Sequence, residues 1–399
     1  PTLTIPLCAT NRINMPDVAE ALLASGQADL VSMARPFLAD PHLVVKAAEG
    51  RVDEINTCIG CNQACLDFTF KGMRSSCLVN PTAGYERDMR EEPVADGSVQ
   101  NIAVVGAGPA GLSFATTAAR RGHRVTLFEA GSEIGGQFNM AKRIPGKEEF
   151  YETLRYFRAR LELDGVVVRL NERVSAEELC GGGGASGGGG GGGGGSEGFD
   201  AVVMATGVTP RRLDGVVPGM GHPSVLSYAD VLAGNAEVGP RVAVIGAGGI
   251  GFDVAEFLAH TPEEQAGRDG DSPGGESIPQ FMAKWGVDRA NENRGGLLPD
   301  GKDGSKWGSP REVTLLQRSA KKHGADLGKT TGWIHRAGLK NSGVHMVGGA
   351  TYTKVDADGN LHVDVATKVD KKTKKVLARE SRVLEVDNIV VCAGQEPLR

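Results

Sequence analysis

The sequence predicts an α/β protein with more than one domain, and three observations predict this class. The chain has 399 residues, which is longer than one hydrophobic core usually reaches. Residues 101–111 and 241–251 each contain a short apolar strand, a GxGxxG turn and the start of a helix. The first fifty residues alternate short apolar segments with helix-like segments, as βα repeats do. Together these features indicate parallel sheets flanked by helices.

Composition and charge exclude several classes of protein. The formal net charge is −5 and no basic stripe is present, which excludes an electrostatic nucleic-acid surface. No run of eighteen apolar residues and no charged-then-apolar leader occurs, so neither a membrane span nor a signal peptide is predicted. We therefore expect a soluble, cytoplasmic protein that acts on a small molecule. The sequence does not define an oligomeric state.

The first GxGxxG turn has the full sequence context of a dinucleotide-binding loop. Gly106 makes the turn, Gly108 lets the backbone approach a pyrophosphate, and Gly111 lets the helix and strand pack closely. The next predicted strand, residues 124–128, ends in Glu129, near the spacing at which an acid accepts hydrogen bonds from ribose hydroxyls. A nucleotide site is therefore expected here, with a tight turn that binds no ligand as the alternative.

The second turn repeats the pattern with a different ending. Its glycines are Gly246, Gly248, Gly249 and Gly251. The following strand, residues 312–316, ends in Gln317 and Arg318 instead of an acid. Arg318 can bind a 2′-phosphate, and Lys321 and Lys322 add positive charge, so the turn predicts a preference for NADPH over NADH. Solvated surface charge is the alternative.

Four of the seven cysteines form a C-x2-C-x3-C-x11-C array, namely Cys58, Cys61, Cys65 and Cys77. This close spacing predicts a shared metal centre. An iron–sulfur cluster is favoured because the array lies between two flavin or nucleotide regions, where one-electron transfer is useful. Structural zinc is the alternative. The isolated Cys8, Cys180 and Cys392 are expected to be small buried hydrophobes.

Three glycine-rich or polar stretches carry no predicted chemistry. Residues 181–198 consist almost entirely of glycine and are expected to form a flexible loop inside a domain. Residues 261–275 and 291–308 are also polar and glycine-rich, and we expect both to be surface insertions.

The first fifty residues contain two short loops that could bind a phosphate. Residues 9–12 follow a short apolar segment, and Ala34 and Arg35 follow a predicted buried strand at residues 29–33. In a (β/α)8 barrel the loops after the last strands often hold a phosphate, which two arginines, Arg12 and Arg35, would suit. An arginine that caps a helix C-terminus is the alternative. Because a whole barrel needs about 250 residues, we expect the chain to contain only the end of one.

The order of these features resembles the iron–sulfur flavoenzymes of the old yellow enzyme, or NADH:flavin oxidoreductase, family. Within that family the resemblance is to the bacterial, NADPH-dependent 2,4-dienoyl-CoA reductases, and it covers nearly the whole chain except the glycine tract. The segments that carry it are residues 10–16, 32–40, 56–65, 134–138 and 328–336. The last segment separates this group from the amine-dehydrogenase relatives.

The resemblance also implies which residues bind which cofactor. An FMN phosphate would be held by Arg12, Ala34 and Arg35, and a [4Fe–4S] cluster by the four cysteines of the array. FAD would be contacted by Gly106, Gly108, Pro109, Ala110, Gly111, Glu129, Gly136, Gln137, Lys147, Val174 and Gly207. NADPH would be contacted by Gly246, Gly248, Gly249, Gly251 and Arg318.

The implied domain order is the end of an FMN-binding barrel, an iron–sulfur segment, an FAD domain, an inserted NADPH domain and a return to the FAD domain. The expected boundaries are residues 1–50, 51–97, 98–215, 216–385 and 386–399. The implied activity is the reduction of 2,4-dienoyl-CoA, an acyl-CoA thioester, in fatty-acid β-oxidation. The catalytic Tyr and His are expected in the missing part of the barrel, and the segment that closes the FAD domain is also expected to be missing. A reductase of another activated alkene and an electron-transfer module are the alternatives.

Overall fold

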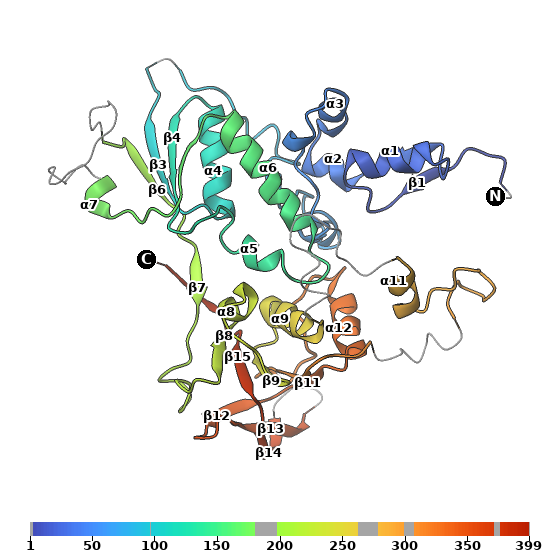
Figure 1. The fold of residues 1–399 in the computed structure, drawn as a ribbon, viewed down its shortest axis with the longest axis vertical. Helices are drawn as coiled ribbons and strands as arrows, with labels where there is room; N and C mark the ends of the chain where they lie inside the picture. The colour runs from blue at the N-terminus through green and yellow to red at the C-terminus, as the bar shows by residue number, and fades with distance from the viewer. Residues whose placement is uncertain are drawn as a thin grey trace. The chain divides into compact units, whose positions relative to one another are not determined.

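The computed structural model describes residues 3–95, 97–179, 198–261, 278–298, 307–370 and 376–398. The chain divides into two compact units (Figure 1). Unit 1 comprises Pro1–Lys142, Glu149–Gly207 and Pro397–Arg399, and unit 2 comprises Arg143–Glu148 and Val208–Glu396. The expected glycine-rich loop, Cys180 and large parts of the other two polar stretches lie outside the described residues. In the described part of the chain, no helix is long and apolar enough to span a membrane.

Unit 1 begins with two βα repeats, as the sequence predicts. Strands β1 and β2 pair in parallel, with Cys8 opposite Leu30. Among the described residues, β2 has no second partner strand, and Leu30 is exposed. The expectation of a buried strand here is therefore wrong, and so is the expectation that Cys8 is buried. The elements of this part are β1 (Cys8–Thr10), α1 (Pro16–Ala24), β2 (Leu30–Ser32), α2 (Arg35–Ala39), α3 (Leu43–Ala48), a 3₁₀ turn (Val52–Glu54) and a π turn (Gln63–Asp67).

The rest of unit 1 is built on a four-stranded parallel sheet of order β5-β4-β3-β6. The strand–turn–helix–strand unit expected around the first GxGxxG turn is present in full. The elements are β3 (Asn101–Val105), α4 (Pro109–Arg120), β4 (Arg124–Phe128), α5 (Phe138–Ala141), α6 (Glu149–Leu163), β5 (Val167–Arg169), α7 (Ala176–Leu179) and β6 (Ala201–Met204).

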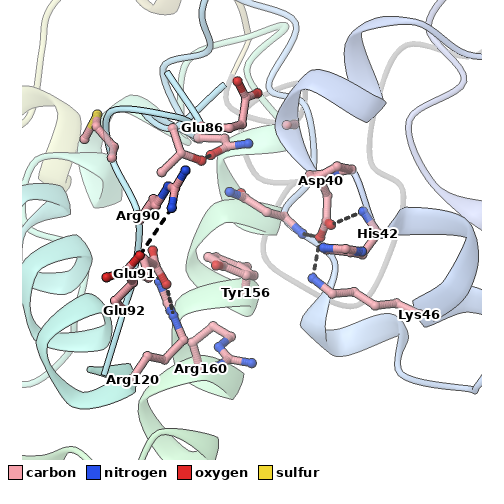
Figure 2. A pocket seen from close by; sticks show the side chains of 16 residues that line it. Asp40, His42, Lys46, Glu86, Arg90, Glu91, Glu92, Arg120, Tyr156 and Arg160 are labelled. Carbon is pink, nitrogen blue, oxygen red and sulfur yellow. Dashed lines mark hydrogen bonds and ion pairs between the residues drawn. The ribbon is translucent and has the colours of Figure 1, made fainter. Parts of the chain in front are cut away.

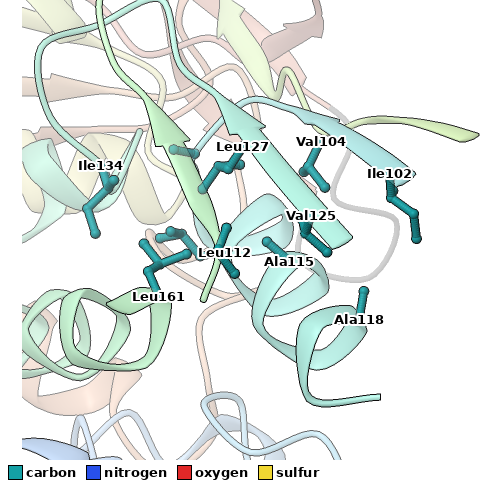
Figure 3. Close-up of a cluster of buried hydrophobic side chains, with 11 residues drawn as sticks. Ile102, Val104, Leu112, Ala115, Ala118, Val125, Leu127, Ile134 and Leu161 are labelled. Carbon is teal, nitrogen blue, oxygen red and sulfur yellow. The ribbon is translucent and has the colours of Figure 1, made fainter. Parts of the chain in front are cut away.

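The alternation of apolar residues along β3 gives this sheet two buried faces. Ile102 and Val104 point to the face that α4 and α6 cover, where they join Leu112 and Leu161 in one apolar cluster (Figure 3). Ala103 points to the opposite face, where it meets Phe128 of β4 and Leu179 of α7. Because both faces are covered, β3 is apolar at every inner position, as a central parallel strand requires.

Unit 2 repeats this plan with a five-stranded parallel sheet of order β11-β10-β9-β15-β8. Its elements are β7 (Val208–Pro210), β8 (Val225–Ser227), α8 (Tyr228–Ala233), β9 (Arg241–Ile245), α9 (Gly249–Ala259), α11 (Ile278–Lys284), β10 (Glu312–Leu316), α12 (Gly332–Asn341), β11 (His345–Val347), β12 (Thr351–Val355), β13 (Leu361–Val369), β14 (Val376–Leu384), β15 (Asn388–Val391) and β16 (Gln395–Pro397).

An antiparallel sheet of order β12-β13-β14 completes unit 2. Its buried residues Leu361 and Val363 pack against Ala243 and Ile245 of β9. Buried residues alternate along the first half of β13, from Leu361 to Val365, and the register with β14 shifts after Ala366. This sheet therefore covers one face of the parallel sheet, and α9 contacts β9 and β10 as well.

The unit boundaries differ from the expected domain boundaries. The strand β15 was expected in the return to the FAD domain, but it pairs with β9 and β8 inside unit 2. The long segment of unit 2 begins at Val208, and the chain returns to unit 1 at Pro397. β15 belongs to unit 2 because its four residues form a parallel strand between β9 and β8.

Candidate functional site

The turn between β3 and α4 has the geometry of a phosphate cradle. Gly106 has a φ of +106°, and a Cβ placed on it would collide with the carbonyl of Ala205. A Cβ on Gly111 would collide with the carbonyl of Gly106. By contrast, a Cβ on Gly108 would meet nothing within 4 Å. The first and third glycines are thus required by packing, whereas the second faces open space at the N-terminus of α4, where an anion is favoured.

The carboxylate of Glu129 is bound to this turn. Its Oε2 accepts a hydrogen bond of 2.8 Å from the N–H of Ala107, and its Oε1 accepts one of 2.7 Å from the N–H of Gly131. The carbonyl of Ala107 accepts from the N–H of Gly135 at 2.8 Å. Glu129 therefore lies where the sequence predicts an acid for a ribose, at the end of β4 beside the glycine turn.

The other predicted FAD residues divide into those near this turn and those away from it. Pro109 and Ala110 form the first turn of α4, and a Cβ on Gly136 would lie 3.0 Å from the Cα of Gly108. Gln137 precedes α5, Gly207 follows β6 with a φ of +74°, and Val174 packs beside Ala103, Phe128 and Leu179. Lys147 belongs to unit 2, where its Nζ lies 2.5 Å from Asp253 Oδ2 on α9.

The turn between β9 and α9 repeats the first turn closely. Gly246 has a φ of +108°, and its Cβ would lie 2.6 Å from the carbonyl of Cys392. A Cβ on Gly251 would collide with the carbonyl of Gly246. A Cβ on Gly248 or Gly249 would meet nothing within 4 Å. This turn therefore also leaves an open position at a helix N-terminus.

The end of β10 differs from the end of β4. Gln317 Nε2 donates to the carbonyls of Ser319, at 2.9 Å, and Lys321, at 2.5 Å, and so folds the following loop back on itself. A cavity of about 110 Å³ lies between this loop and the glycine turn. Its lining includes Gly248, Gly249, Gln317, Ser319, Lys321 and Lys322.

Arg318 is not among the described residues that line this cavity. Burial raises the pKa of Tyr352 to about 12, and the charge of Arg318 acts against that rise, so Arg318 lies near Tyr352. The sequence thus indicates a basic loop at the correct strand end, and the structure brings Lys321 and Lys322, rather than Arg318, to the glycine turn.

Another cavity lies at the carboxyl ends of β1 and β2 in unit 1. It has a volume of about 320 Å³, and all three residues predicted to hold an FMN phosphate line it, namely Arg12, Ala34 and Arg35. Arg12 and its neighbour Asn11 both have a positive φ, of +57° and +82°. Such strain in non-glycine residues is concentrated at functional sites.

The two arginines have partners that the sequence does not indicate. Arg12 forms an ion pair with Glu149 at the start of α6, and Arg35 donates to Asn62 Oδ1. A Cβ on Gly60 would lie 2.7 Å from the Arg12 guanidinium, so glycine at this position leaves room for that side chain.

The four predicted cluster cysteines converge in the same region of unit 1. Burial raises the pKa of Cys58 and Cys77, and it raises the pKa of Cys61 to about 11. The charges of other cysteines of the array act in the same direction. In the described part of the chain, no group of three or more His, Cys, Asp or Glu is arranged to hold a metal ion.

Backbone N–H groups and the two arginines counteract the effect of burial on the pKa of these thiols. The N–H of Gly60 bonds to Cys58, that of Gln63 to Cys61, and those of Val79 and Asn80 to Cys77. The charges of Arg35 and Arg12 also lower the pKa of Cys58. N–H donors and nearby positive charge both stabilise thiolates.

Two further residues hold this segment in place by hydrogen bonds, and the sequence did not indicate either of them. Asn14 is buried and donates its Nδ2 to the carbonyl of Cys58 at 3.0 Å. Arg155 of α6 donates to the carbonyl of Ile55 at 2.8 Å and to the hydroxyl of Thr57 at 3.2 Å. Because Arg155 lies about one hundred residues away along the chain, no local pattern could have revealed its role.

Each unit contains one strand–glycine–helix turn. The strand after the first turn ends on an acid, and the strand after the second ends on a basic loop. These features define an oxidoreductase with two dinucleotide-type domains. The comparison with known families agrees, because residues 100–399 match the pyridine nucleotide-disulphide oxidoreductase family. The chain belongs to this family, and it is therefore a flavoprotein oxidoreductase that uses a flavin and a nicotinamide nucleotide. Residues 2–54 match the NADH:flavin oxidoreductase / NADH oxidase family.

Individual relatives match different shares of the chain. A metal reductase from Desulforamulus reducens is 32% identical over 385 residues, which is 96% of this chain and 51% of the relative. An NADH oxidase from Thermoanaerobacter brockii is 35% identical over 268 residues, covering 64% of this chain and 38% of the relative. The structure of a 2-naphthoyl-CoA reductase complex matches with a TM-score of 0.75 and 27% identity, over 99% of this chain and 48% of that one. The chain thus spans about half the length of these relatives or less.

Proposed function

We propose that this chain is the electron-delivering part of an NADPH-dependent reductase that acts on the activated C=C bond of an acyl-CoA thioester, 2,4-dienoyl-CoA in the first instance. The observation that carries this proposal is the convergence of Arg12 and Arg35 on Cys58 within one unit. A phosphate cavity whose two arginines also act on a thiol of the array suits a relay in which an FMN lies next to an iron–sulfur cluster.

The residue types at these sites suit the implied cofactors, although in the described part of the chain the four thiols are not arranged to hold a metal ion. Gly108 leaves open space at the first helix N-terminus for the pyrophosphate of FAD, and Gly248 does so at the second for NADPH. Arg12 and Arg35 supply the positive charge that an FMN phosphate requires. The array supplies the four thiolates that a [4Fe–4S] cluster takes. When bound, the flavins and the cluster would supply hydride and single-electron transfer, respectively.

The chain's own residues would bind and orient these groups. Glu129 would accept hydrogen bonds from a ribose while it keeps the turn at Ala107 in place. Lys321 and Lys322 would neutralise a 2′-phosphate beside Gly248. The N–H groups that bond to Cys58, Cys61 and Cys77 would stabilise negative charge on the sulfurs.

The test uses the longer polypeptide that contains this chain, assayed for NADPH oxidation with 2,4-dienoyl-CoA, 2-naphthoyl-CoA and a free enal. Consumption of NADPH coupled to loss of the dienoyl chromophore supports the proposal. Reduction of the other substrates but not of the dienoyl thioester would restrict the proposal to a related ene-reductase. 2-Naphthoyl-CoA is included because one similar solved structure is that of a 2-naphthoyl-CoA reductase.

The metal can be tested on this chain alone. After anaerobic reconstitution, we expect iron and sulfide to bind and to give a visible charge-transfer absorbance. Cys61→Ser should abolish that absorbance while FAD still binds, and Cys8→Ser, which changes an exposed thiol outside the array, should leave it unchanged. Zinc instead of iron in the purified protein would contradict the relay.

A second candidate function is electron transfer to an inorganic or protein acceptor. It is favoured by the relative named a metal reductase, which matches 96% of this chain. Rapid NADPH-dependent reduction of a ferric chelate, with no reduction of any C=C substrate by the longer polypeptide, would support this alternative.

A further inference from the structure

The cavity at the carboxyl ends of β1 and β2 has a lining with unbalanced positive charge. Among the described residues that line it are two arginines, Arg12 and Arg35, and no carboxylate. Arg35 donates to a neutral partner, Asn62 Oδ1. The carboxylate of Glu149 pairs with Arg12 but does not line the cavity. The cavity therefore presents two guanidinium groups, which favour a phosphate.

Packing alone does not fix the guanidinium of Arg12. Its side chain is 50% exposed, whereas that of Glu149 is 19% exposed. A long, half-exposed side chain loses rotamer freedom when it binds a ligand, and a partner that holds it beforehand removes this cost. Two contacts hold the guanidinium here. Glu149 accepts from Nη2, and the backbone of Gly60 lies so close to Nη1 that a Cβ would come within 2.7 Å.

Glu149 is held in place because it is the first residue of α6, a helix that is fixed on two sides. On one side, Leu161 packs in the apolar cluster of the four-stranded sheet. On the other side, Arg155 donates to the carbonyl of Ile55 at 2.8 Å. All of these residues belong to unit 1, as does Arg12. The carboxylate that holds Arg12 is thus attached to a rigid element.

The middle of α6 is tied to the same segment by an ion pair. Figure 2 shows this part of the helix, where Tyr156 and Arg160 face a cavity of about 630 Å³. Arg160 Nη1 lies 3.3 Å from Glu54 Oε2, and the two side chains are only 16% and 17% exposed. Salt screens such a partly buried pair less than an exposed one. The position of α6 beside residues 52–57 is therefore fixed along more than two turns.

Arg12 keeps donors for a ligand while it is paired with Glu149. A guanidinium carries five N–H donors, and the bond to Glu149 uses Nη2. Donors on Nε and Nη1 are left for an oxyanion. A phosphate in the cavity can therefore bind Arg12 without breaking the ion pair.

We propose that Glu149 is a positioning residue for Arg12, which it holds at the cavity before the phosphate of FMN binds. This inference rests on the proposed function, because it takes that phosphate as the ligand. The carboxylate does not contact the ligand. It raises affinity through Arg12, by reducing the rotamer freedom that is lost on binding. Its effect is therefore limited to flavins that carry the phosphate.

The test uses the longer polypeptide that contains this chain, freed of FMN and titrated with FMN or riboflavin by flavin fluorescence. Glu149→Ala should raise the Kd for FMN about tenfold, because the rotamer freedom of one arginine corresponds to a factor of that order. The Kd for riboflavin, which has no phosphate, should hardly change. This difference between the two flavins is a result that a merely structural role of Glu149 would not produce.

Two further variants serve as rescue and control. Glu149→Gln keeps an acceptor oxygen for Arg12, so it should restore most of the affinity and stay within about threefold of the wild type. It also keeps the proposal testable if Glu149→Ala fails to fold. Glu162→Ala changes an exposed carboxylate on the same helix and should leave both Kd values unchanged.

Two results would overturn the inference. Unchanged or tighter binding of FMN by Glu149→Ala would show that the carboxylate does not position Arg12, or that it competes with the phosphate. An equal loss for FMN and riboflavin would show a general structural role.

Arg35→Ala separates this inference from the proposed function. Arg35 lines the cavity, so its loss should also weaken binding of FMN more than binding of riboflavin. If Arg35→Ala shows this difference and Glu149→Ala does not, only the role of Glu149 is wrong. If the wild type binds no FMN, or if Arg35→Ala affects both flavins alike, the assignment of the cavity to FMN is wrong and this inference fails with it.

Discussion

The two glycine turns of this protein share a backbone but differ in the residue that follows the next strand. In each, the first glycine has a φ near +107° and lies under the carbonyl of a residue just beyond a neighbouring strand, Ala205 after β6 or Cys392 after β15. In each, the third glycine lies against the carbonyl of the first. The strand after the first turn ends in Glu129, however, and the strand after the second ends in Gln317 and a basic loop.

This difference separates what holds a turn together from what selects a ligand. Gly106, Gly111, Gly246 and Gly251 are required by contacts with the backbone, which are the same in both units. A ribose diol needs an acceptor, and a 2′-phosphate needs positive charge. On the proposed function, the residue at the strand end selects the nucleotide, and the glycines leave room for it. Substitutions at the turns and at the strand ends test this division, from the largest expected effect to the smallest.

Replacing the third glycine should unfold the turn in either unit. Gly111→Ala and Gly251→Ala each place a Cβ against a backbone carbonyl, and each should lower the free energy of unfolding by about 3 kcal/mol. Gly108→Ala and Gly248→Ala are the matched controls, since their Cβ atoms meet open space. These controls should stay within about 0.5 kcal/mol of the wild type but lose nucleotide affinity. Denaturant unfolding measures the first effect, and calorimetric titration the second.

Glu129→Gln should weaken FAD binding without affecting the second turn. The change removes the charge that accepts from Ala107 and from a ribose, and hydrogen bonds to charged groups contribute about 1.5–3 kcal/mol each. We expect a loss of FAD affinity of about tenfold to one-hundredfold by fluorescence titration, with NADPH affinity unchanged. Glu133→Gln, an exposed carboxylate on the same segment, should leave both affinities unchanged.

Replacing both Lys321 and Lys322 by Ala should raise the Kd for NADPH about tenfold, because roughly one charge-assisted hydrogen bond is lost. The Kd for NADH should hardly change. Arg318→Ala tests the sequence-based assignment, which predicts a higher KM for NADPH alone. An effect of Arg318→Ala without an effect of the lysine pair would show that the cavity beside Gly248 does not hold the phosphate. Lys340→Ala, at the end of α12, is the control.

Tyr352 should give unit 2 a stability loss at high pH. Burial raises its folded pKa to about 12, whereas an exposed tyrosine titrates at about 10. The unfolded chain therefore loses its proton first, so stability should fall as the pH rises from 10 towards 12, by at most about 1.4 kcal/mol per pH unit. Tyr352→Phe should remove this fall in guanidinium titrations. The same slope in both proteins would contradict the assignment.

Local patterns were sufficient to predict the strands and helices around the two glycine turns. Strands β3, β4, β9 and β10 and the helices that follow the two glycine turns lie where the sequence predicts them. Boundaries between domains were less predictable. A strand such as β15 carries the same apolar sequence whichever sheet it joins, so only its pairing with β9 assigned it to unit 2.

The sequence by itself determined the features that depend on steric and chemical properties of adjacent residues. A glycine at φ near +107°, an acid at a strand end and four closely spaced thiols can each be recognised from their neighbours. Only the tertiary structure decided the contacts between distant segments. It paired Arg12 with Glu149 and brought Lys321 and Lys322 to Gly248. The reason is physical: such contacts depend on how whole helices and strands pack, and no local pattern of residues encodes that packing.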